Sequence, residues 1–375
     1  MEFMSFLQSF VVSFLVVILI MPTFISLMKK HNVLDRCGGR KIHKGEKVNL
    51  GGIVIFIGFA VALISVFFTS KIESFYFEIT FLILLACSVF VGVRDDMNSL
   101  SPSSKLILEV AVILFLCEMN IRIDNLYGFM GIYKLNPFVS YALTLFVFIV
   151  ILNAYNLIDG IDGQATTQAL AVFIPILLFL LFIVPFSVRS NWGSVYFWIV
   201  ICLAIIGALF AFLIFNWEPS KIFMGDTGSI TIGIILSSTM IAAIRFGGCL
   251  EQNAELYNCP IKSVIGVVFS LFFIPLADTL RVFAYRVSRR RSPMYPDKSH
   301  IHHYFIRTGA THKTTALITL SFSLVTSLIC IILSLFFNDN ILIPILVILF
   351  FVYIFALKYI TKYRIKKMRL VRHKS

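Results

Sequence analysis

Eleven long runs of apolar residues divide this sequence, and they limit what the chain can fold into more than any other feature. A helix that crosses the hydrocarbon core of a bilayer needs about 20 mostly apolar residues. The runs cover residues 5–28, 51–69, 76–93, 106–120, 137–152, 166–186, 194–214, 229–245, 261–283, 315–336 and 340–357. Only 14% of the residues are charged, against roughly 25% in soluble domains. We therefore expect an all-α polytopic integral membrane protein with about 11 transmembrane helices, forming one domain over residues 1–375.

The basic residues are distributed unevenly between the segments that join these runs. Alternate segments hold 26 of the 32 Lys and Arg residues, and the other segments hold 6. Cytoplasmic loops carry the excess of Lys and Arg, so the basic set is predicted to be cytoplasmic, with the N-terminus outside and the C-terminus inside. This set comprises residues 29–50, 94–105, 153–165, 215–228 and 281–314 and the basic tail 358–375. The net charge of +13 then reflects topology in an inner (plasma) membrane, and no nucleic acid partner is expected.

Acidic residues cluster in these predicted cytoplasmic loops, close to the ends of spans. They are Asp95, Asp96, Asp159, Asp162 and Asp226. A carboxylate near a bilayer is costly, so five that face one compartment need a common reason. Mg²⁺ is held by one or two carboxylates together with substrate phosphate oxygens. The loops therefore predict a shared Mg²⁺ and phosphate site, with Mn²⁺ as a metal that can substitute.

The same loops supply positive groups and flexible turns. The positive groups are Lys44, Lys105, Lys221, His300, His302 and His303. Glycines at 160, 163, 225 and 228 let the backbone approach a ligand closely, and Thr227 or Ser229 is expected to cap the eighth span. Acids for a metal and bases for phosphates are the components of phosphoryl transfer.

Each motif also has a structural interpretation. Two adjacent Asp residues at a helix start usually act as a cap, and three His residues can hold zinc. A secondary transporter or lipid flippase also has about a dozen spans with membrane-embedded acids, but transporters place such groups near the midplane, in paired repeats. No repeat is visible in this sequence, and the acids lie at one face.

Four long motifs in this order resemble the polyprenyl-phosphate N-acetylhexosamine-1-phosphate transferases, which form glycosyltransferase family four. Residues 95–105 are similar to DDxxxLxPxxK, residues 153–163 to NxxNxxDGxDG, residues 215–229 to FNxxPxKIFMGDxGS, and residues 275–303 to the P…D…SP…PD…HIHH region. The HIHH form is that of the undecaprenyl-phosphate N-acetylglucosamine-1-phosphate branch. Residues 40–52 resemble RKxHxGxxPxxGG, but Val48 replaces the usual Pro.

The resemblance implies a reaction and its partners. N-acetylhexosamine-1-phosphate, most simply GlcNAc-1-phosphate, passes from a UDP-sugar to undecaprenyl phosphate and UMP is released, which starts a cell-surface polysaccharide. The active site would be formed by the cytoplasmic loops, membrane lipids would surround the bundle, and a homodimer is a state known in related enzymes. The sequence leaves open which N-acetylhexosamine is used and which polymer is initiated.

The resemblance also implies roles for individual residues. Asn156 and Asp226 would bind Mg²⁺. Asp95, Asp96, Asp159, His300, His302 and His303 would form the catalytic set, and Lys44, Lys105, Asp162, Asn216 and Phe223 would bind substrate. Phe223 would stack on uracil, and Lys105 would position phosphate. Asp95 and Asp96 titrate as a pair, so neither is assigned as the base, and direct attack by the lipid phosphate is preferred to a covalent Asp intermediate.

Overall fold

The computed structural model describes residues 2–33, 47–69, 76–185, 194–257, 259–290 and 300–372. Within these ranges the chain is helical, and its only strand-like pairings are two isolated β-bridges. The long helices are α1 (Glu2–Lys30), α2 (Gly51–Thr69), α3 (Tyr76–Met97), α4 (Pro102–Glu118), α5 (Pro137–Ile158), α6 (Gln164–Leu178), α8 (Ser194–Asn216), α9 (Gly225–Gln252), α12 (Phe273–Ser288), α14 (His312–Ser334) and α15 (Asp339–Arg372). The short elements are η1 (Phe129–Gly131), η2 (Phe179–Ile183), α10 (Ala254–Tyr257), α11 (Val264–Leu271) and α13 (Ile301–Arg307).

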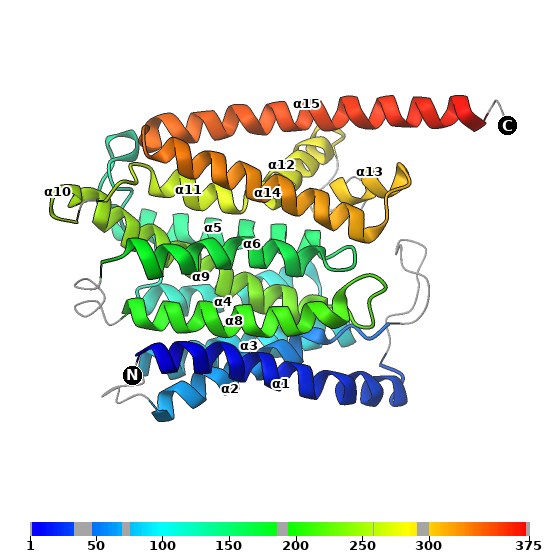
Figure 1. The fold of residues 1–375 in the computed structure, drawn as a ribbon, viewed down its shortest axis with the longest axis horizontal. Coiled ribbons are helices and arrows are strands. Elements are labelled where there is room, and N and C mark those ends of the chain that lie inside the picture. The colour runs from blue at the N-terminus through cyan, green and yellow to red at the C-terminus, as the bar shows by residue number, and fades with distance from the viewer. Residues whose placement is uncertain are drawn as a thin grey trace.

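The helices confirm a multi-pass membrane protein without settling the number of passes. Nine helices in the described parts of the chain are long and apolar enough to span a bilayer, or ten if a bent pair counts as one span. α4 covers another predicted run, but it has 17 residues, fewer than the roughly 20 that a span needs. The count of eleven therefore stays a prediction. The two chain ends lie at opposite ends of the bundle (Figure 1), as an odd number of passes requires.

One predicted span is broken into two helices. The run 261–283 forms α11 and α12, which meet at a 75° bend. Pro275 lies in the first turn of α12, where a proline is tolerated, but its ring would clash with the carbonyl of Leu271 if α11 continued. The helix therefore ends at Leu271 and restarts in a new direction at Phe273.

The central helix of the bundle is α9. The whole of its most apolar segment is buried, and α2, α3, α5, α6, α8 and α11 pack around it. Close approach at its first turn depends on glycine, because a Cβ on Gly52 would lie 2.1 Å from the amide N of Gly228. A Cβ on Gly92 would lie 2.3 Å from Cα of Thr227. These contacts fix α2 and α3 against the start of α9, where the acidic motif lies.

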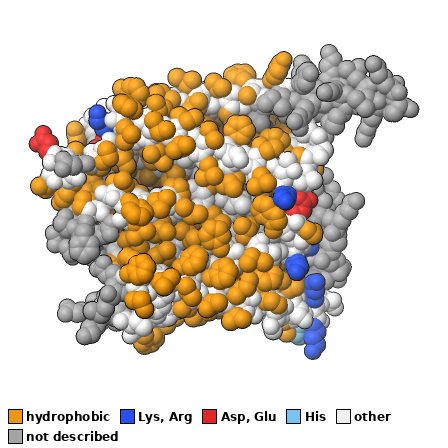
Figure 2. Space-filling model, in the orientation of Figure 1, with side chains coloured by type: hydrophobic (Ala, Val, Ile, Leu, Met, Phe, Trp, Pro, Cys, Tyr) orange, Lys and Arg blue, Asp and Glu red, His pale blue; other side chains and the backbone are white. Residues whose placement is uncertain are grey.

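The surface of the bundle matches a bilayer environment. Hydrophobic side chains cover the middle of the face seen in Figure 2, and charged side chains gather toward its two ends. α15 continues beyond its apolar part as one helix to Arg372, so the helix runs through most of the predicted tail 358–375. The end of the bundle that carries α13 also carries the loops between α3 and α4, between α5 and α6, and between α8 and α9.

Candidate active site

Asp96 anchors the start of the central helix. Its Oδ1 accepts hydrogen bonds from the backbone N–H of Asp226 (2.9 Å) and from Nδ2 of Asn49 (3.0 Å). Its Oδ2 accepts from the backbone N–H and the hydroxyl of Thr227, at 2.9 and 2.6 Å. A carboxylate at a helix N-terminus satisfies free N–H groups and complements the helix dipole. The first turn of α9 is thus capped by Asp96 from α3 and not by the hydroxyl of Thr227 or Ser229, which corrects the predicted cap.

Lys105 joins two acidic motifs. Its Nζ lies 2.9 Å from Oδ2 of Asp95 and 2.9 Å from Oδ1 of Asp226. The other oxygen of Asp95 accepts a hydrogen bond from the backbone N–H of Leu100 (2.7 Å), which closes the turn between α3 and α4. This salt-bridge network brings residues 95, 105 and 226 together, as the sequence predicts. Asp226 remains about a third exposed and is more accessible to a ligand than Asp95, which is 10% exposed.

Asn156 brings the second motif to the same place. Its side-chain amide donates to Oδ1 of Asp226 and to Oγ of Ser229 (2.8 Å). Asp159 follows at the end of α5. Burial and the negative charges of Asp226 and Asp96 raise the pKa of Asp159 to about 7. Crowded carboxylates of this kind favour the binding of a cation.

Asp162 is held inside a network of protein groups. Its carboxylate, 3% exposed, accepts from the backbone N–H and the hydroxyl of Ser220 and lies 3.3 Å from Nζ of Lys47. Nδ1 of His312 lies 3.6 Å away. Burial opposes ionisation, but the nearby ring of His312, the hydrogen bonds from Ser220 and the charge of Lys47 outweigh it and hold the pKa of Asp162 well below its usual range. The carboxylate of Asp162 is thus occupied by protein groups in this structure, and its predicted contact with substrate stays a prediction.

Asn216 has a similar structural position. It is 2% exposed, and its Oδ1 accepts from the backbone N–H of Gly163 (3.1 Å) and the hydroxyl of Thr166 (3.0 Å). Its Nδ2 donates to the carbonyl of Ile222 (3.0 Å). All these partners are protein groups, so the geometry favours a residue that holds the start of α6 against the 217–224 loop over one that contacts a nucleotide.

Phe223 is half-buried and carries a cation on one face. Nζ of Lys47 lies 4.7 Å from the ring centroid, and the backbone N–H of Phe223 donates to the carbonyl of Val48 (2.8 Å). Gly51 and Gly52 donate in return to the carbonyls of Phe223 and Met224, both at 3.0 Å. The segment before α2 therefore pairs with the third motif, and it retains this pairing with Val48 in place of the expected Pro.

The histidines reach the site through α13. The ring nitrogen Nε2 of His302 lies 2.6 Å from where a Cβ on Gly160 would be, so His302 packs directly on the second motif. Burial and the neighbouring His303 lower the pKa of His302 to about 3. His302 is therefore a neutral hydrogen-bonding group at physiological pH, and it does not provide the positive charge expected from the histidine cluster. The rings of His302 and His303 are 4.4 Å apart between centroids, whereas His300 is buried against Asp278.

The oxygen-rich donor set fits a hard divalent cation that also takes ligands from a substrate. Among the residues that the structure describes, no three His, Cys, Asp or Glu side chains form a closed metal cage. Mg²⁺ does not need one, because it binds through one or two carboxylates plus phosphates and waters. Asp226, with the neighbouring Asn156 and Asp159, would supply the protein part of such a site.

One predicted site residue lies outside the described residues, and three residues that contact the site carboxylates were not predicted from the sequence. Lys44 falls in the undescribed segment 34–46. Lys47, Asn49 and His312 were not predicted, yet they bind the carboxylates of Asp162 and Asp96. Lys47 and Asn49 carry a signal in their position at the end of the first basic loop, a few residues before Gly51 and Gly52. His312 carries none, because it opens an apolar helix.

Comparisons with known proteins show the family of this chain. A model of glycosyl transferase family 4 matches residues 78–244. A probable undecaprenyl-phosphate N-acetylglucosaminyl 1-phosphate transferase of Bacillus subtilis is 26% identical over 334 residues, covering 87% of this chain and 84% of the relative. A decaprenyl-phosphate N-acetylglucosaminephosphotransferase of Mycobacterium tuberculosis is 30% identical over 295 residues (74% and 70%). An undecaprenyl-phosphate alpha-N-acetylglucosaminyl 1-phosphate transferase of Escherichia coli O157:H7 is 30% identical over 311 residues (80% and 76%).

The apolar bundle and the polar cluster at one of its ends define a multi-pass membrane transferase. The similarity to these relatives extends over most of the chain, and the match to the family model includes all three motifs that meet at Asp226. The chain belongs to glycosyl transferase family 4, among the polyprenyl-phosphate N-acetylhexosamine-1-phosphate transferases.

Proposed function

We propose that the protein transfers GlcNAc-1-phosphate from UDP-GlcNAc to undecaprenyl phosphate, releases UMP and so starts a cell-surface polysaccharide. The observation that carries this proposal is the junction at Lys105, whose Nζ contacts carboxylates of two separate motifs, Asp95 and Asp226. A third motif reaches the same carboxylate through Asn156. A site of alternating acidic and basic groups suits a reaction between two phosphate-bearing substrates.

The metal proposed for this site is Mg²⁺, which Mn²⁺ can replace. Asp226 and Asn156 would hold it, and when bound it would act as a Lewis acid that neutralises charge on the leaving UMP. Lys105 offsets part of the negative charge of Asp95 and Asp226. That compensation lets two anionic substrates approach a region already rich in carboxylates.

The transfer itself needs little help from a base. A phosphate monoester has a second pKa of about 6, so the acceptor phosphate is largely dianionic near neutral pH. Its oxygen attacks the phosphorus that carries the sugar, the bond to the bridging oxygen of UMP breaks, and the lipid-linked diphosphate sugar is formed. We prefer this direct route to a covalent Asp intermediate. Asp95 and Asp96 are both already hydrogen-bonded within the protein, which disfavours either of them as a nucleophile.

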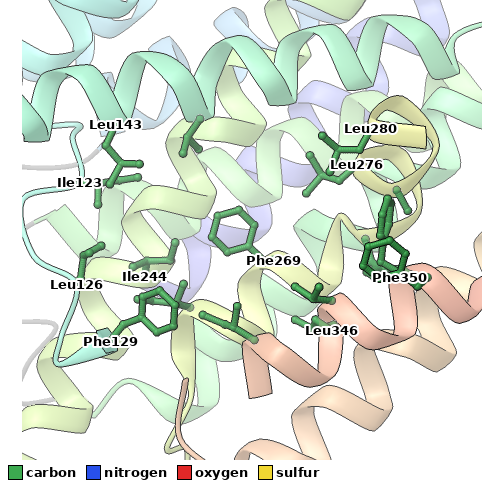
Figure 3. A pocket seen from close by; sticks show the side chains of 17 residues that line it. Ile123, Leu126, Phe129, Leu143, Ile244, Phe269, Leu276, Leu280, Leu346 and Phe350 are labelled. Atoms are coloured by element: carbon green, nitrogen blue, oxygen red, sulfur yellow. The ribbon is translucent and has the colours of Figure 1, made fainter. Parts of the chain in front are cut away.

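The lipid chain of the acceptor needs an apolar surface next to the polar site. A cavity of about 530 Å³ lies at the bend between α11 and α12 and is lined by hydrophobic side chains from α5, α9, α11, α12 and α15. Figure 3 shows Phe269, Leu276, Leu280 and Phe350 around it. The cavity is large enough for several isoprene units. Its lining includes Ile244, 18 residues along α9 from Asp226, so it suits a part of the polyprenyl tail beyond the units next to the phosphate.

A reconstitution assay tests the proposal. Purified protein in liposomes with undecaprenyl phosphate, Mg²⁺ and UDP-GlcNAc is expected to release UMP, and the lipid product should gain the mass of GlcNAc-1-phosphate. A panel of other UDP-N-acetylhexosamines identifies the preferred sugar. No UMP release with any donor would contradict a transferase and favour the alternative, a lipid flippase or transporter, because transport produces no UMP.

We also propose that the site lies on the cytoplasmic side of the inner membrane, because UDP-sugars are made in the cytoplasm. A cysteine introduced at Ser101 should then resist an external thiol reagent that cannot cross the membrane.

A further inference from the structure

A buried carboxylate on α12 binds the start of the histidine helix. Asp278 is 1% exposed, and no role has yet been given to it. Both of its oxygens lie 3.1 Å from the backbone N–H of Ile301. Its Oδ2 also lies 3.0 Å from Nδ1 of His300, and its Oδ1 lies 2.6 Å from a guanidinium nitrogen of Arg281. One carboxylate thus holds a backbone group, a ring and a cation.

The bonds around His300 fix its tautomer. Its other ring nitrogen, Nε2, lies 3.4 Å from a guanidinium nitrogen of Arg286. Arginine only donates hydrogen bonds, so Nε2 must accept and the ring proton lies on Nδ1, directed at Asp278. His300 is 4% exposed and occupied on both sides, which makes it a structural link between α12 and α13 and not a group that meets substrate.

The next histidine has the opposite character. His302 is 3% exposed, and its Nδ1 has no hydrogen-bond partner in the described part of the chain. A buried, unpaired ring nitrogen is costly. The other ring nitrogen of His302, Nε2, is the one that faces Gly160 of the active-site loop. The rings of His300 and His302 are parallel, with centroids 5.9 Å apart. His300 is the N-cap of α13 and His302 lies in its first turn, so contacts that hold His300 also hold the backbone that carries His302.

We propose that Asp278 is a positioning residue that sets His302 against the active-site loop, so that His302 can hydrogen-bond the UDP-sugar. The proposal rests on the proposed function for the identity of the ligand. Asp278 acts through two contacts, the ring of His300 and the backbone of Ile301, and it touches no substrate. Removal of its charge releases the start of α13 and leaves the Lys105 network intact.

The test compares Asp278→Asn with a matched control. Asp339→Asn changes another buried Asp, 5% exposed, which binds the N–H of Gly266 and the hydroxyl of Ser263 at the start of α11. Hydrogen exchange should rise at least tenfold at residues 301–307 in Asp278→Asn and stay unchanged there in Asp339→Asn. This readout needs no activity, so it tests the contact even if the reaction assigned to the protein is wrong.

Kinetics test the role in the reaction. In Asp278→Asn we expect the KM for UDP-GlcNAc to rise about tenfold to 100-fold while the KM for undecaprenyl phosphate changes less than twofold; Asp278→Glu should recover part of the loss. A parallel rise in the acceptor KM would overturn the proposal, because α12 also lines the apolar cavity and a general shift of α12 would disturb both substrates. Unchanged donor KM in an active enzyme, or unchanged exchange at α13, would overturn it as well.

A double-mutant cycle adds an independent check. Gly160→Ala adds a Cβ 2.6 Å from Nε2 of His302 and should displace the ring from the other side. If both changes act through the position of His302, the double variant should lose about as much donor affinity as the worse single variant. Fully additive losses would show that Asp278 acts by another route and would overturn the assignment.

Discussion

Nζ of Lys105 lies 2.9 Å from Oδ1 of Asp226, although 121 residues separate them in the chain. The same nitrogen lies 2.9 Å from Asp95, so one cation holds the end of α3, the start of α4 and the start of α9. Charge-assisted hydrogen bonds of this kind contribute roughly twice as much as neutral ones. Lys105 is therefore a structural link, and in the proposed function it is also a positive group that meets the phosphates.

Replacement of Lys105 should impair turnover strongly. Lys105→Met removes two charge-assisted hydrogen bonds and leaves Asp95 and Asp226 without their shared cation. A loss of about 1.5–3 kcal/mol per bond to a charged group predicts a fall in kcat/KM of at least tenfold to 100-fold. Lys105→Arg should retain more activity, because it keeps the charge. UMP release measures the effect, and near-normal turnover in Lys105→Met would remove Lys105 from the site.

Asp96 should affect stability as well as activity. Asp96→Ala removes the acceptor for two backbone N–H groups and one hydroxyl at the start of α9. Loss of a helix cap costs about 0.5–2 kcal/mol, so the melting temperature in detergent should fall by several degrees. Asp95→Ala is the comparison, because it frees one backbone N–H and one contact of Lys105, which keeps its contact with Asp226, and it should lower the melting temperature less. Equal melting temperatures for Asp96→Ala and the wild type would contradict the capping role.

Mg²⁺ binding should weaken as the pH falls through 7. Burial and the nearby Asp226 and Asp96 raise the pKa of Asp159 to about 7, so below this pH its carboxyl gains a proton and loses its attraction for a cation. The apparent Kd for Mg²⁺, measured by the metal dependence of UMP release, should rise between pH 8 and pH 6. Asp159→Asn should bind Mg²⁺ more weakly at pH 8 and show a flatter pH profile. The same slope in wild type and variant would exclude Asp159 as the titrating group.

Gly225 should tolerate no side chain. Its φ is +73°, and a Cβ there would lie 2.2 Å from the carbonyl oxygen of Asn49 and 2.7 Å from Oδ2 of Asp96. Gly225→Ala should therefore displace the cap of α9 and abolish activity. Gly131→Ala is the matched control, since its φ is +75° but nothing lies within 4 Å of the added carbon. It carries only the backbone strain, about 1–2 kcal/mol. Similar losses in both variants would show that strain, and not the contact with Asp96, is responsible.

The sequence allowed the helical class, most helix positions and the meeting of the acidic motifs to be predicted, because each follows from local pattern. Long apolar runs must be helices in a membrane, and spans of alternating direction bring their loops to common faces. The bend between α11 and α12 was missed, although Pro275 carries a signal for it. A continuous apolar run satisfies the criterion for a span whether or not the helix is broken within it.

The individual roles were harder to predict than the location of the site. Asp96 and Asp226 are both acidic and both lie in motifs, but only the structure distinguishes the one that caps α9 from the one that is a third exposed. The partners of Asp162 come from residues 47, 220 and 312, which no periodic pattern connects. Such contacts depend on how helices far apart in the sequence pack together, and this packing cannot be predicted from the local patterns of a single sequence.

The enclosure of α9 by other helices has a consequence for how the enzyme sits in its lipid environment. Its apolar segment is covered by protein along its whole length, so lipid molecules touch the outer helices and not the one that presents Asp226. Changes in bilayer thickness are absorbed by tilting at the periphery, while the distance between Asp226 and its neighbours is set from within the protein. The reaction centre is thereby insulated from the membrane that delivers its acceptor.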